Sequence, residues 1–359
     1  MEISKYVLPF EACDLTMVDR VGGKCASLGE LLRAQIPVPP GYAITTDAYK
    51  SFLEENGLTR KVLERLENLD DRKVEEINAA STDIRSWIEA GTISIPLEDV
   101  IAEHYRLLSR RTRTPACPVA VRSSATAEDL PNASFAGQQD TYLWVRGVED
   151  LLDKTRKCWS SLFTPRAISY RINMGFAHSD VLISVAVQKM VRSFTAGVMF
   201  TLNPATGDPA TVVIDSNWGY GESVVSGEVT PDQFQVNKIT MEIMKKTVSD
   251  KAIYYTTDPE TDEVKKLEVD AERRTQQSLL DAEILDLARL GKVIEKHYGK
   301  PMDIEWATEK SLPYKGEAFI LQGRPETVWS QKEAKPIVDP KKSALEHIVA
   351  GLLAGKKIK

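Results

Sequence analysis

The sequence feature that most constrains this fold is an alternating stretch near the carboxyl end, at residues 301–325. Residues 303–307 alternate polar and apolar side chains, which is the period of a strand with one wet face and one packed face. A second β-compatible run at residues 318–322 follows a turn at residues 312–316. The two runs therefore predict an antiparallel hairpin.

Several polar side chains of this hairpin fall on shared faces. Side chains two residues apart in a strand point to the same side, which pairs Asp303 with Glu305 and Gln322 with Arg324. Carboxylate and amide oxygens suit Mg2+, and a guanidinium fork suits phosphate oxygens, so a meeting of these pairs would form a magnesium and polyphosphate site. The alternative is an edge hairpin with solvated charges, and this stretch alone leaves both open.

Composition limits the class of protein. Hydrophobic residues make up 42% and charged residues 27% of the 359-residue chain, which is typical of a globular protein of about two domains. A net charge of -6 argues against a nucleic-acid partner. We find no export signal and no apolar run of about 18 residues, so we expect no membrane association and a cytoplasmic location. The 4 cysteines form no C-x-x-C pair, which predicts packed, reduced thiols.

Two segments in the first half of the chain suit phosphate. A Gly-Gly turn and Lys24 begin an apolar pattern at helical spacing, and backbone N–H groups at a helix start attract anions. The P-loop pattern is absent, and a plain turn with a solvated lysine is the alternative. Arg122 ends a buried strand and leads into a loop of small and hydroxylated residues at 123–139, where it suits phosphate. Its alternative is a structural ion pair.

A switch from helical to strand-like patterns near residue 190 divides the chain. Further on, Glu222 follows a turn with two glycines, and its carboxylate is a candidate to accept a hydrogen bond from a sugar hydroxyl. Turns of this kind are common, so the motif alone is a weak signal. A long amphipathic helix follows, for which Ser278 is the predicted N-cap and Gly299 the predicted end. The predicted organisation is a helix-rich lobe, a strand-rich lobe and a tail with a linker and a short helix: residues 1–190, 191–328 and 329–359.

Several of these segments resemble the N-terminal ATP-binding region of the family that includes phosphoenolpyruvate synthase, pyruvate phosphate dikinase and rifampicin phosphotransferase. The resemblance extends over about residues 21–328. It depends on ordered motifs at residues 21–24, 26–30, 39–42, 121–129, 134–138 and 322–327. The family implies an α+β, ATP-grasp-like fold of two lobes, with the nucleotide held in the cleft between them.

The resemblance also implies roles for single residues at the phosphates of ATP. Lys24 and Arg122 would hold the phosphates, and the loop around Ser134 to Gly137 would close over them. Arg324 would bind the terminal phosphates. These cations, Lys24, Arg122 and Arg324, would be the catalytic residues because they neutralise charge during phosphoryl transfer.

Further implied roles concern the base, the ribose and the metal. The backbone of a hinge would meet adenine, and this hinge consists of Gln188, Lys189, Met190 and Val191. Glu222 would approach the ribose. Asp303, Glu305 and Gln322 would serve Mg2+. This sequence departs from some relatives by extra residues between Glu305 and Gln322, so the resemblance extends to the ends of the hairpin and not to its turn.

None of the 4 histidines has the setting of the family's phosphoryl-accepting histidine, which lies in a Gly-rich motif containing Thr or Ser. Each is more simply a helix-surface or packed histidine: His104, His178, His297 and His347. We therefore predict that the accepting histidine lies on a separate partner subunit.

The predicted function is that of the ATP-binding subunit of a dikinase-type phosphotransferase. The chain would bind Mg-ATP and transfer the β-phosphoryl group to the partner's histidine, with AMP and phosphate as the other products. In domain content it is most similar to the smaller subunit of phenylphosphate synthase, an enzyme of anaerobic phenol degradation. A subunit like that of phosphoenolpyruvate synthase or rifampicin phosphotransferase is an alternative. An ATP-grasp ligase and a non-catalytic, nucleotide-binding regulatory subunit are further alternatives.

Overall fold

The computed structural model describes most of the chain in one compact unit, Met1–Glu326, and a second unit, Thr327–Lys359, is described only at residues 327–329. The described residues are 5–67, 69–70, 72–127, 129–130, 133–134, 140–258, 261, 263–309 and 318–329. Of residues 129–130 and 133–134 only the backbone is described. The predicted tail helix lies outside these residues.

A five-stranded sheet is built from short apolar runs of the first half of the chain, and each strand pairs antiparallel with its neighbours. In spatial order its strands are β1 (Val7–Pro9), β2 (Gly41–Ile44), β7 (Ile183–Lys189), β3 (Val119–Ala125) and β6 (Thr141–Val145). The strands β2, β3 and β7 are almost continuously buried, because both faces of this sheet are covered.

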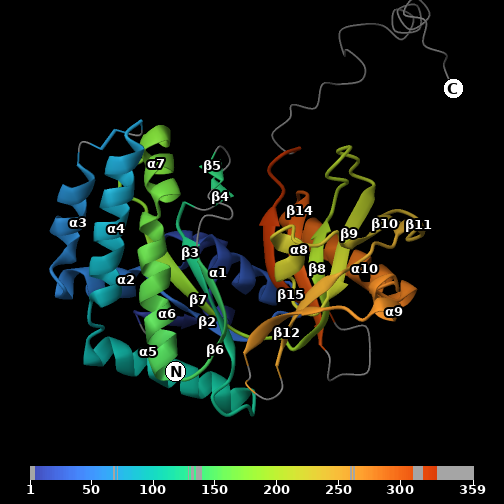
Figure 1. Ribbon diagram of the computed structural model, residues 1–359, viewed down its shortest axis with the longest axis horizontal. Helices are drawn as coiled ribbons and strands as arrows, with labels where there is room; N and C mark the ends of the chain where they lie inside the picture. The colour runs from blue at the N-terminus through green and yellow to red at the C-terminus, as the bar shows by residue number, and fades with distance from the viewer. Residues whose placement is uncertain are drawn as a thin grey trace, which may run out of the picture. The chain divides into compact units, whose positions relative to one another are not determined.

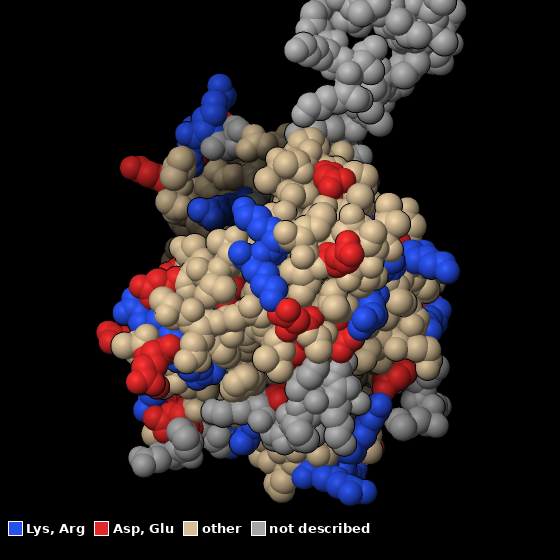
Figure 2. Space-filling model, turned by 90° about the vertical axis from the view of Figure 1, so that its right-hand side faces the viewer, with Lys and Arg blue, Asp and Glu red and all other residues tan. Residues whose placement is uncertain are grey.

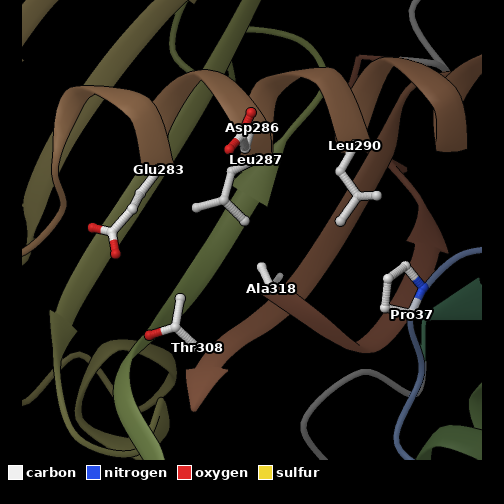
Figure 3. A pocket seen from close by; sticks show the side chains of 7 residues that line it. All are labelled: Pro37, Glu283, Asp286, Leu287, Leu290, Thr308 and Ala318. Atoms are coloured by element: carbon white, nitrogen blue, oxygen red, sulfur yellow. The ribbon is translucent and has the colours of Figure 1, made fainter. Parts of the chain in front are cut away.

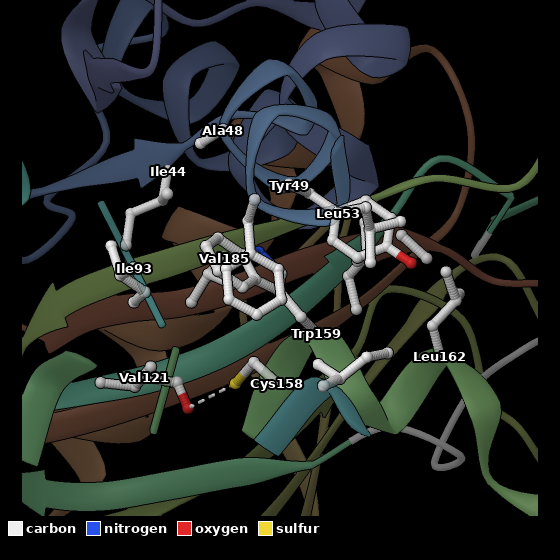
Figure 4. Packing of buried hydrophobic residues seen from close by; sticks show 14 of the residues in the cluster. Ile44, Ala48, Tyr49, Leu53, Ile93, Val121, Cys158, Trp159, Leu162 and Val185 are labelled. Atoms are coloured by element: carbon white, nitrogen blue, oxygen red, sulfur yellow. Dashed lines mark hydrogen bonds between the residues drawn. The ribbon is translucent and has the colours of Figure 1, made fainter. Parts of the chain in front are cut away.

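Helices cover one face of the five-stranded sheet, at the left of Figure 1. They are α2 (Thr46–Glu55), α3 (Leu58–Leu66), α4 (Val74–Ala90), α5 (Ile95–Arg111), α6 (Val148–Ser160) and α7 (Pro165–Met174). Trp159 of α6 is fully buried and lies beside Tyr49 of α2 (Figure 4). The centroid of its ring is 4.8 Å from that of Phe52 and 6.0 Å from that of Tyr49. These rings belong to a hydrophobic cluster that also contains residues of the five-stranded sheet, so the packing joins the helices to this face of the sheet.

A six-stranded antiparallel sheet follows in the second half of the chain. In spatial order its strands are β11 (Ile243–Thr247), β10 (Asp232–Asn237), β9 (Thr211–Trp218), β8 (Ser193–Phe200), β14 (Met302–Glu309) and β15 (Ala318–Pro325). Helix α10 (Asp281–Tyr298) packs against β9, β10 and β14.

Shorter elements complete the fold. They are the 3-10 helices η1 (Phe10–Ala12), η2 (Leu15–Met17) and η3 (Ser161–Phe163), the helices α8 (Glu222–Val225) and α9 (Ala271–Arg274), and two pairs of antiparallel strands, β4 (Asp129–Leu130) with β5 (Ala133–Ser134) and β12 (Ile253–Thr257) with β13 (Val264–Glu268).

Helix α1 (Val18–Arg33) connects the two sheets through a shared hydrophobic core. It contacts β3 and β7 of the first sheet and β15 of the second. Its buried residues Leu28 and Leu31 belong to one cluster with Ala186 of β7 and with Ile304 and Ile320 of β14 and β15. The two sheets are therefore tied together at the buried face of this helix.

The structure confirms the α+β class and the predicted hairpin. Strands β14 and β15 pair antiparallel, with Asp303 opposite Arg324 and Glu305 opposite Gln322. The predicted turn at residues 312–316 lies outside the described residues. The 4 cysteines are buried free thiols, as predicted. In the described part of the chain, no helix is both long and apolar enough to cross a bilayer.

The predicted start of the long helix is wrong. Helix α10 begins at Asp281, and Leu280 is its N-cap residue, with the backbone N–H of Leu280 donating to Glu283 at 2.6 Å. The hydroxyl of Ser278 donates instead to buried Asp232 at 2.7 Å, because that carboxylate offers a stronger acceptor. The predicted end is confirmed, since Gly299 adopts a left-handed conformation with φ 67° after the last turn.

Candidate functional site

A cavity of about 610 Å³ is lined by residues of both sheets and of α1. Its volume lies within the range of roughly 300–1,000 Å³ that is usual for small-molecule sites. The predicted site residues that line it are Lys24, Arg122, Gln188, Lys189, Met190, Val191, Glu222, Glu305, Gln322 and Arg324. Asp303 is not among the lining residues. The side chain of Ser134 and all of Gly137 lie outside the described part of the structure.

A kink in α1 brings Lys24 to this cavity. Gly22 has φ 70° and interrupts the helix, and a Cβ atom there would lie 2.0 Å from the carbonyl oxygen of Ser124 in β3. Only glycine fits this close approach in this conformation. The hydroxyl of Ser124 donates to the carbonyl oxygen of Val21 at 2.9 Å and holds the kinked turn of the helix against the strand. The predicted Gly-Gly turn therefore serves packing as well as placing Lys24.

Arg122 joins the two sheets by an ion pair. Its Nη2 atom lies 2.6 Å from Oε2 of Glu305, and its Nη1 donates to the carbonyl oxygen of Leu321 at 3.2 Å. Burial alone would raise the pKa of the Glu305 carboxyl, but the charges of Arg122 and Lys24 hold its pKa below the ordinary value. Arg122 therefore lines the cavity. It also forms a structural ion pair, which was the alternative to phosphate binding in the sequence analysis.

Arg324 is held by a carboxylate of the neighbouring strand. Its Nε and Nη2 atoms donate to Oδ2 of Asp303 at 2.9 Å and 2.7 Å. Burial raises the pKa of Asp303, Arg324 opposes this shift, and the charge of Glu305 adds to it. Asp303 thus orients the guanidinium of Arg324, which lines the cavity while Asp303 does not.

Gln322 presents a buried amide next to these charges. It lies opposite Glu305 in the ladder, and its Oε1 atom has no hydrogen-bond partner among the described residues. An unpaired buried oxygen beside a carboxylate fits a Mg2+ ion, which uses one or two carboxylates together with waters and phosphate oxygens. No cluster of at least 3 His, Cys, Asp or Glu side chains suited to a metal occurs in the described ranges.

The cavity lining also contains apolar side chains, and Ala120, Leu143, Met190 and Tyr220 pack in one cluster. The backbone N–H groups of Lys189 and Met190 donate to the carbonyl oxygens of Pro40 and Pro118, both at 2.9 Å. These two N–H groups are therefore already paired, and a nucleobase at the predicted hinge would bind other backbone or side-chain groups of residues 188–191. The lining therefore combines cationic side chains with an apolar cluster.

Glu222 reaches the cavity from a tightly packed turn. A Cβ atom on Gly219, which has φ 70°, would lie 2.0 Å from the carbonyl oxygen of Tyr255 in β12. The N–H of Tyr220 donates to the same carbonyl at 2.8 Å, and Glu222 follows as the first residue of α8. Burial and the charge of Glu305 raise the pKa of Glu222. This carboxylate is well placed to accept a hydrogen bond from a polar ligand.

Sequence reasoning missed several lining residues: Asp140, Thr141, Leu143, Ser193, Gly197, Tyr220, Trp306 and Leu321. Thr141 and Leu143 lie on one face of β6, where Thr141 is opposite Arg122. The short apolar run around Leu143 is a signal that could have predicted this strand. Trp306 follows a register shift in β14 after Glu305, which simple alternation does not predict.

Two other pockets differ in size and chemistry. The pocket in Figure 3 has a volume of about 50 Å³ and lies beneath α10, with Glu283, Leu287 and Ala318 in its lining. This volume suits a few waters rather than a nucleotide. A cavity of about 340 Å³ lies beside α1 and the end of α10, and His297 lines it.

The described histidines are packed or on helix surfaces, as predicted. Nδ1 of His104 lies 2.9 Å from the carbonyl oxygen of Val100, one helical turn earlier. His178 accepts a hydrogen bond from Nε of Arg171 at 2.9 Å, and His297 lies 2.6 Å from Glu30. None of these three lines the 610 Å³ cavity. His347 lies outside the described residues.

Acidic and basic side chains are interspersed on the face of the molecule in Figure 2. No single sign of charge dominates that face, which agrees with the small net charge of -6. An extended basic surface is what a nucleic-acid site would require.

Comparisons with known proteins identify a family. The family model described as "Pyruvate phosphate dikinase, AMP/ATP-binding domain" matches residues 18–345. A "Probable phosphoenolpyruvate synthase" of Methanocaldococcus jannaschii is 46% identical over 336 residues, covering 94% of this chain and 27% of that protein. Proteins of the same name from Staphylothermus marinus and Methanothermobacter thermautotrophicus are each 44% identical, covering 89% and 98% of this chain but 41% and 51% of their own lengths.

This chain therefore spans about half the length of these relatives or less. The family match covers most of the chain and confirms the resemblance that the sequence motifs indicated. The chain belongs to the family of the pyruvate phosphate dikinase AMP/ATP-binding domain.

Proposed function

We propose that this chain binds Mg-ATP in the 610 Å³ cavity and forms the ATP-handling half of a dikinase-type phosphotransferase similar to phosphoenolpyruvate synthase. In this proposal the two sheets with their helices are the two lobes of an ATP-grasp-like fold, with the boundary near residue 190 and the nucleotide between them. Family membership and the names of the relatives support the choice of ATP and of this reaction class.

One observation carries the proposal: three cations from distant segments meet a carboxylate and an unpaired amide oxygen in one cavity. Lys24, Arg122 and Arg324 come from α1, β3 and β15, and Glu305 and Gln322 face each other between β14 and β15. This set matches the needs of a triphosphate and its divalent cation.

The residues would act mainly by positioning and neutralising charge. Phosphoryl transfer needs little covalent chemistry from the protein, so the guanidinium groups of Arg122 and Arg324 and the ammonium of Lys24 would hold the phosphate oxygens. Glu305 and Gln322 would hold Mg2+, which supplies charge neutralisation between the phosphates when it is bound. Asp303 would orient Arg324. The loop around Ser134 and Gly137 would exclude water, and Glu222 would bind the ribose.

The phosphoryl acceptor in this proposal is a histidine outside these 359 residues, on a partner subunit. A nitrogen of that histidine attacks the β-phosphorus, the bond between this phosphorus and the oxygen that bridges to the α-phosphorus breaks, and AMP leaves. Water then attacks the γ-phosphorus, the bond between it and the oxygen that bridges to the β-phosphorus breaks, and phosphate leaves, so the β-phosphoryl group stays on the histidine. Phenylphosphate synthase remains a narrower prediction, which the relatives' names do not support. A cytoplasmic location also remains a prediction.

The test is phosphoryl transfer to candidate histidine-bearing subunits with ATP labelled at the β- or the γ-position. We expect β-label on the partner, γ-label in free phosphate, and AMP. Stable γ-label on the partner, with ADP left behind, would overturn the proposal. ATP turnover by the isolated chain that depends on a carboxylic acid would favour an ATP-grasp ligase.

A second experiment separates catalysis from regulation. In Glu305→Gln the side chain keeps its size but loses the charge beside Arg122 and Lys24. We expect product formation to fall by at least about 100-fold while the complex with the partner still forms. The matched control is Glu64→Gln, because Glu64 pairs with Arg60 on the surface. Unchanged product formation by Glu305→Gln would indicate a regulatory binding module.

A further inference from the structure

The cavity of about 340 Å³ lies apart from the one proposed for the nucleotide. Its volume is also within the range of roughly 300–1,000 Å³ that is usual for small-molecule sites. Residues of η2, α1, α10 and β15 line it, together with Thr126 after β3 and Lys300 after α10. The two cavities share no lining residue. A ligand of the smaller cavity would therefore contact side chains that the proposed nucleotide site does not use.

Strand β15 separates the two cavities. Gln322 and Arg324 line the larger cavity, whereas Gly323 and Pro325 line the smaller one. Successive residues of a strand face opposite sides, so the two cavities lie on opposite sides of β15. The hydroxyl of Ser27 in α1 donates to the carbonyl oxygen of Gly323 at 2.5 Å and joins the helix to this strand.

Several side chains of the smaller cavity carry oxygens that can accept hydrogen bonds. Oε1 of Glu30 lies 2.6 Å from Nε2 of His297, and this single contact leaves the carboxylate with further acceptor sites. The hydroxyl oxygens of Ser27 and Tyr298 lie 3.0 Å apart, and a hydroxyl oxygen has two lone pairs. These acceptors suit a ligand that carries hydroxyl groups.

Lys300 determines which charge such a ligand should have. Glu30 is bonded to His297, whereas the side chain of Lys300 has no ion pair among the described residues. An ammonium group forms strong charge-assisted hydrogen bonds with a carboxylate or a phosphate. Leu15 and Pro325 in the same lining offer aliphatic contact for the carbon atoms of a ligand.

We propose that the 340 Å³ cavity binds a small hydroxylated organic anion, the class that includes sugar phosphates and sugar acids. The phosphate or carboxylate binds Lys300, and the hydroxyl groups donate to Glu30 and Ser27. The carbon skeleton packs against Leu15 and Pro325. This inference does not depend on the proposed function, because a ligand here leaves the larger cavity free for a nucleotide.

Isothermal titration calorimetry of the 359-residue chain with glucose 6-phosphate and with gluconate tests this site. Mg2+ and a non-hydrolysable ATP analogue are present in excess, so that the larger cavity is occupied. We expect at least one of the two compounds to bind with a Kd of about 1 mM or below. Glucose and inorganic phosphate should each bind at least about tenfold more weakly, because each lacks one part of the contacts. The preferred compound distinguishes a phosphate from a carboxylate ligand.

Lys300→Gln should weaken binding of the preferred compound about tenfold. The matched control is Lys296→Gln, because Lys296 is an exposed residue of the last turn of α10 outside the cavity lining. It should keep the wild-type affinity.

Three results would overturn the inference: binding of neither compound, equal affinities of Lys300→Gln and wild type, or equal affinities for glucose and glucose 6-phosphate. Binding that disappears when the ATP analogue is added would do the same, because it would place the anion in the larger cavity. Failure of the analogue itself to bind would count against the proposed function alone, since binding that depends on Lys300 would still support the second site.

Discussion

At the residue scale, the cavity contains an ion pair whose two side chains come from distant parts of the chain. Arg122 and Glu305 are separated by 183 positions, and their side chains are only 12% and 25% exposed. The sequence indicated a role for each, but not that they pair with each other. The partner of a charged side chain depends on tertiary packing, which local patterns do not contain.

Replacing Arg122 by Met should destabilise the protein at neutral pH by about 2 kcal/mol, between the values for exposed and buried pairs. Because Arg122 lowers the pKa of Glu305, the stabilisation is present above the ordinary value of 4.5 and is lost as the pH falls through the lowered pKa. Urea unfolding of wild type and variant at several pH values measures this difference. This difference should shrink as the pH falls below the ordinary value of 4.5.

The control for this variant is Arg60→Met, because the side chains of Arg60 and its partner Glu64 are 88% and 55% exposed. Its effect should stay below about 0.5 kcal/mol at all pH values. An Arg122→Met effect as small as that of the control would mean that the Arg122–Glu305 pair contributes nothing to stability.

His178 should make the protein acid-sensitive. Burial, and then the charge of Arg171, lowers the pKa of His178 from 6.5 to about 4, and its Nδ1 accepts a hydrogen bond from Arg171. Between these values the unfolded chain binds more protons, so stability is complete above pH 6.5 and falls toward pH 4. His178→Asn offers an uncharged acceptor and should reduce this fall by roughly 1–3 kcal/mol in pH-dependent thermal unfolding. An unchanged pH profile would contradict the assignment.

At the scale of elements, local pattern predicted the hairpin well because alternation and turn residues act over a few positions. Asp303 and Glu305 were expected on one face, and both remain partly exposed beside buried Ile304. The start of α10 was mispredicted because Ser278 binds Asp232, which lies 46 positions away. A helix cap can be predicted locally only when no distant group competes for it.

Gly22 should be essential to the junction of α1 and β3. Gly22→Ala places a Cβ 2.0 Å from the carbonyl oxygen of Ser124 and forces a side chain into a positive-φ conformation. We expect a loss of about 3 kcal/mol in the free energy of unfolding, from strain and overpacking together. Chemical denaturation measures it. Gly57 is the matched control, since it has φ 64° and a Cβ atom there would meet no other atom within 4 Å, so Gly57→Ala should cost only about 1 kcal/mol.

The affinity for Mg-ATP gives a second measure of the same junction. Because Gly22 fixes the position of Lys24, Gly22→Ala should also weaken nucleotide binding, whereas Gly57→Ala should not. Equal effects of the two variants on stability would show that the close approach to Ser124 is tolerated.

At the scale of the whole molecule, the cavity is assembled from segments that no sequence spacing relates. Lys24, Arg122, Gln188 and Glu305 come from α1, β3, β7 and β14. Periodicity predicted these elements singly, and only the resemblance to a known family predicted that they meet. The assembly follows from the shared core around α1, because burial of this helix fixes both sheets.

The shared core predicts that the two sheets unfold together. Leu31 is fully buried in the cluster that contains residues of both sheets, so Leu31→Ala should cost roughly 2–5 kcal/mol. Hydrogen exchange followed by mass spectrometry should show that amides of β7 and β14 lose protection to a similar extent. Loss of protection in one sheet alone would mean that the sheets are independent folding units.

The contact between Arg122 and Glu305 also has a consequence for the order in which small ions and nucleotides bind. A divalent ion arriving alone would have to compete with a guanidinium that already neutralises the carboxylate. A triphosphate offers that guanidinium a substitute anion and frees the carboxylate for the ion. Metal and nucleotide should therefore show positive heterotropic linkage, each raising the affinity of the protein for the other by the same factor.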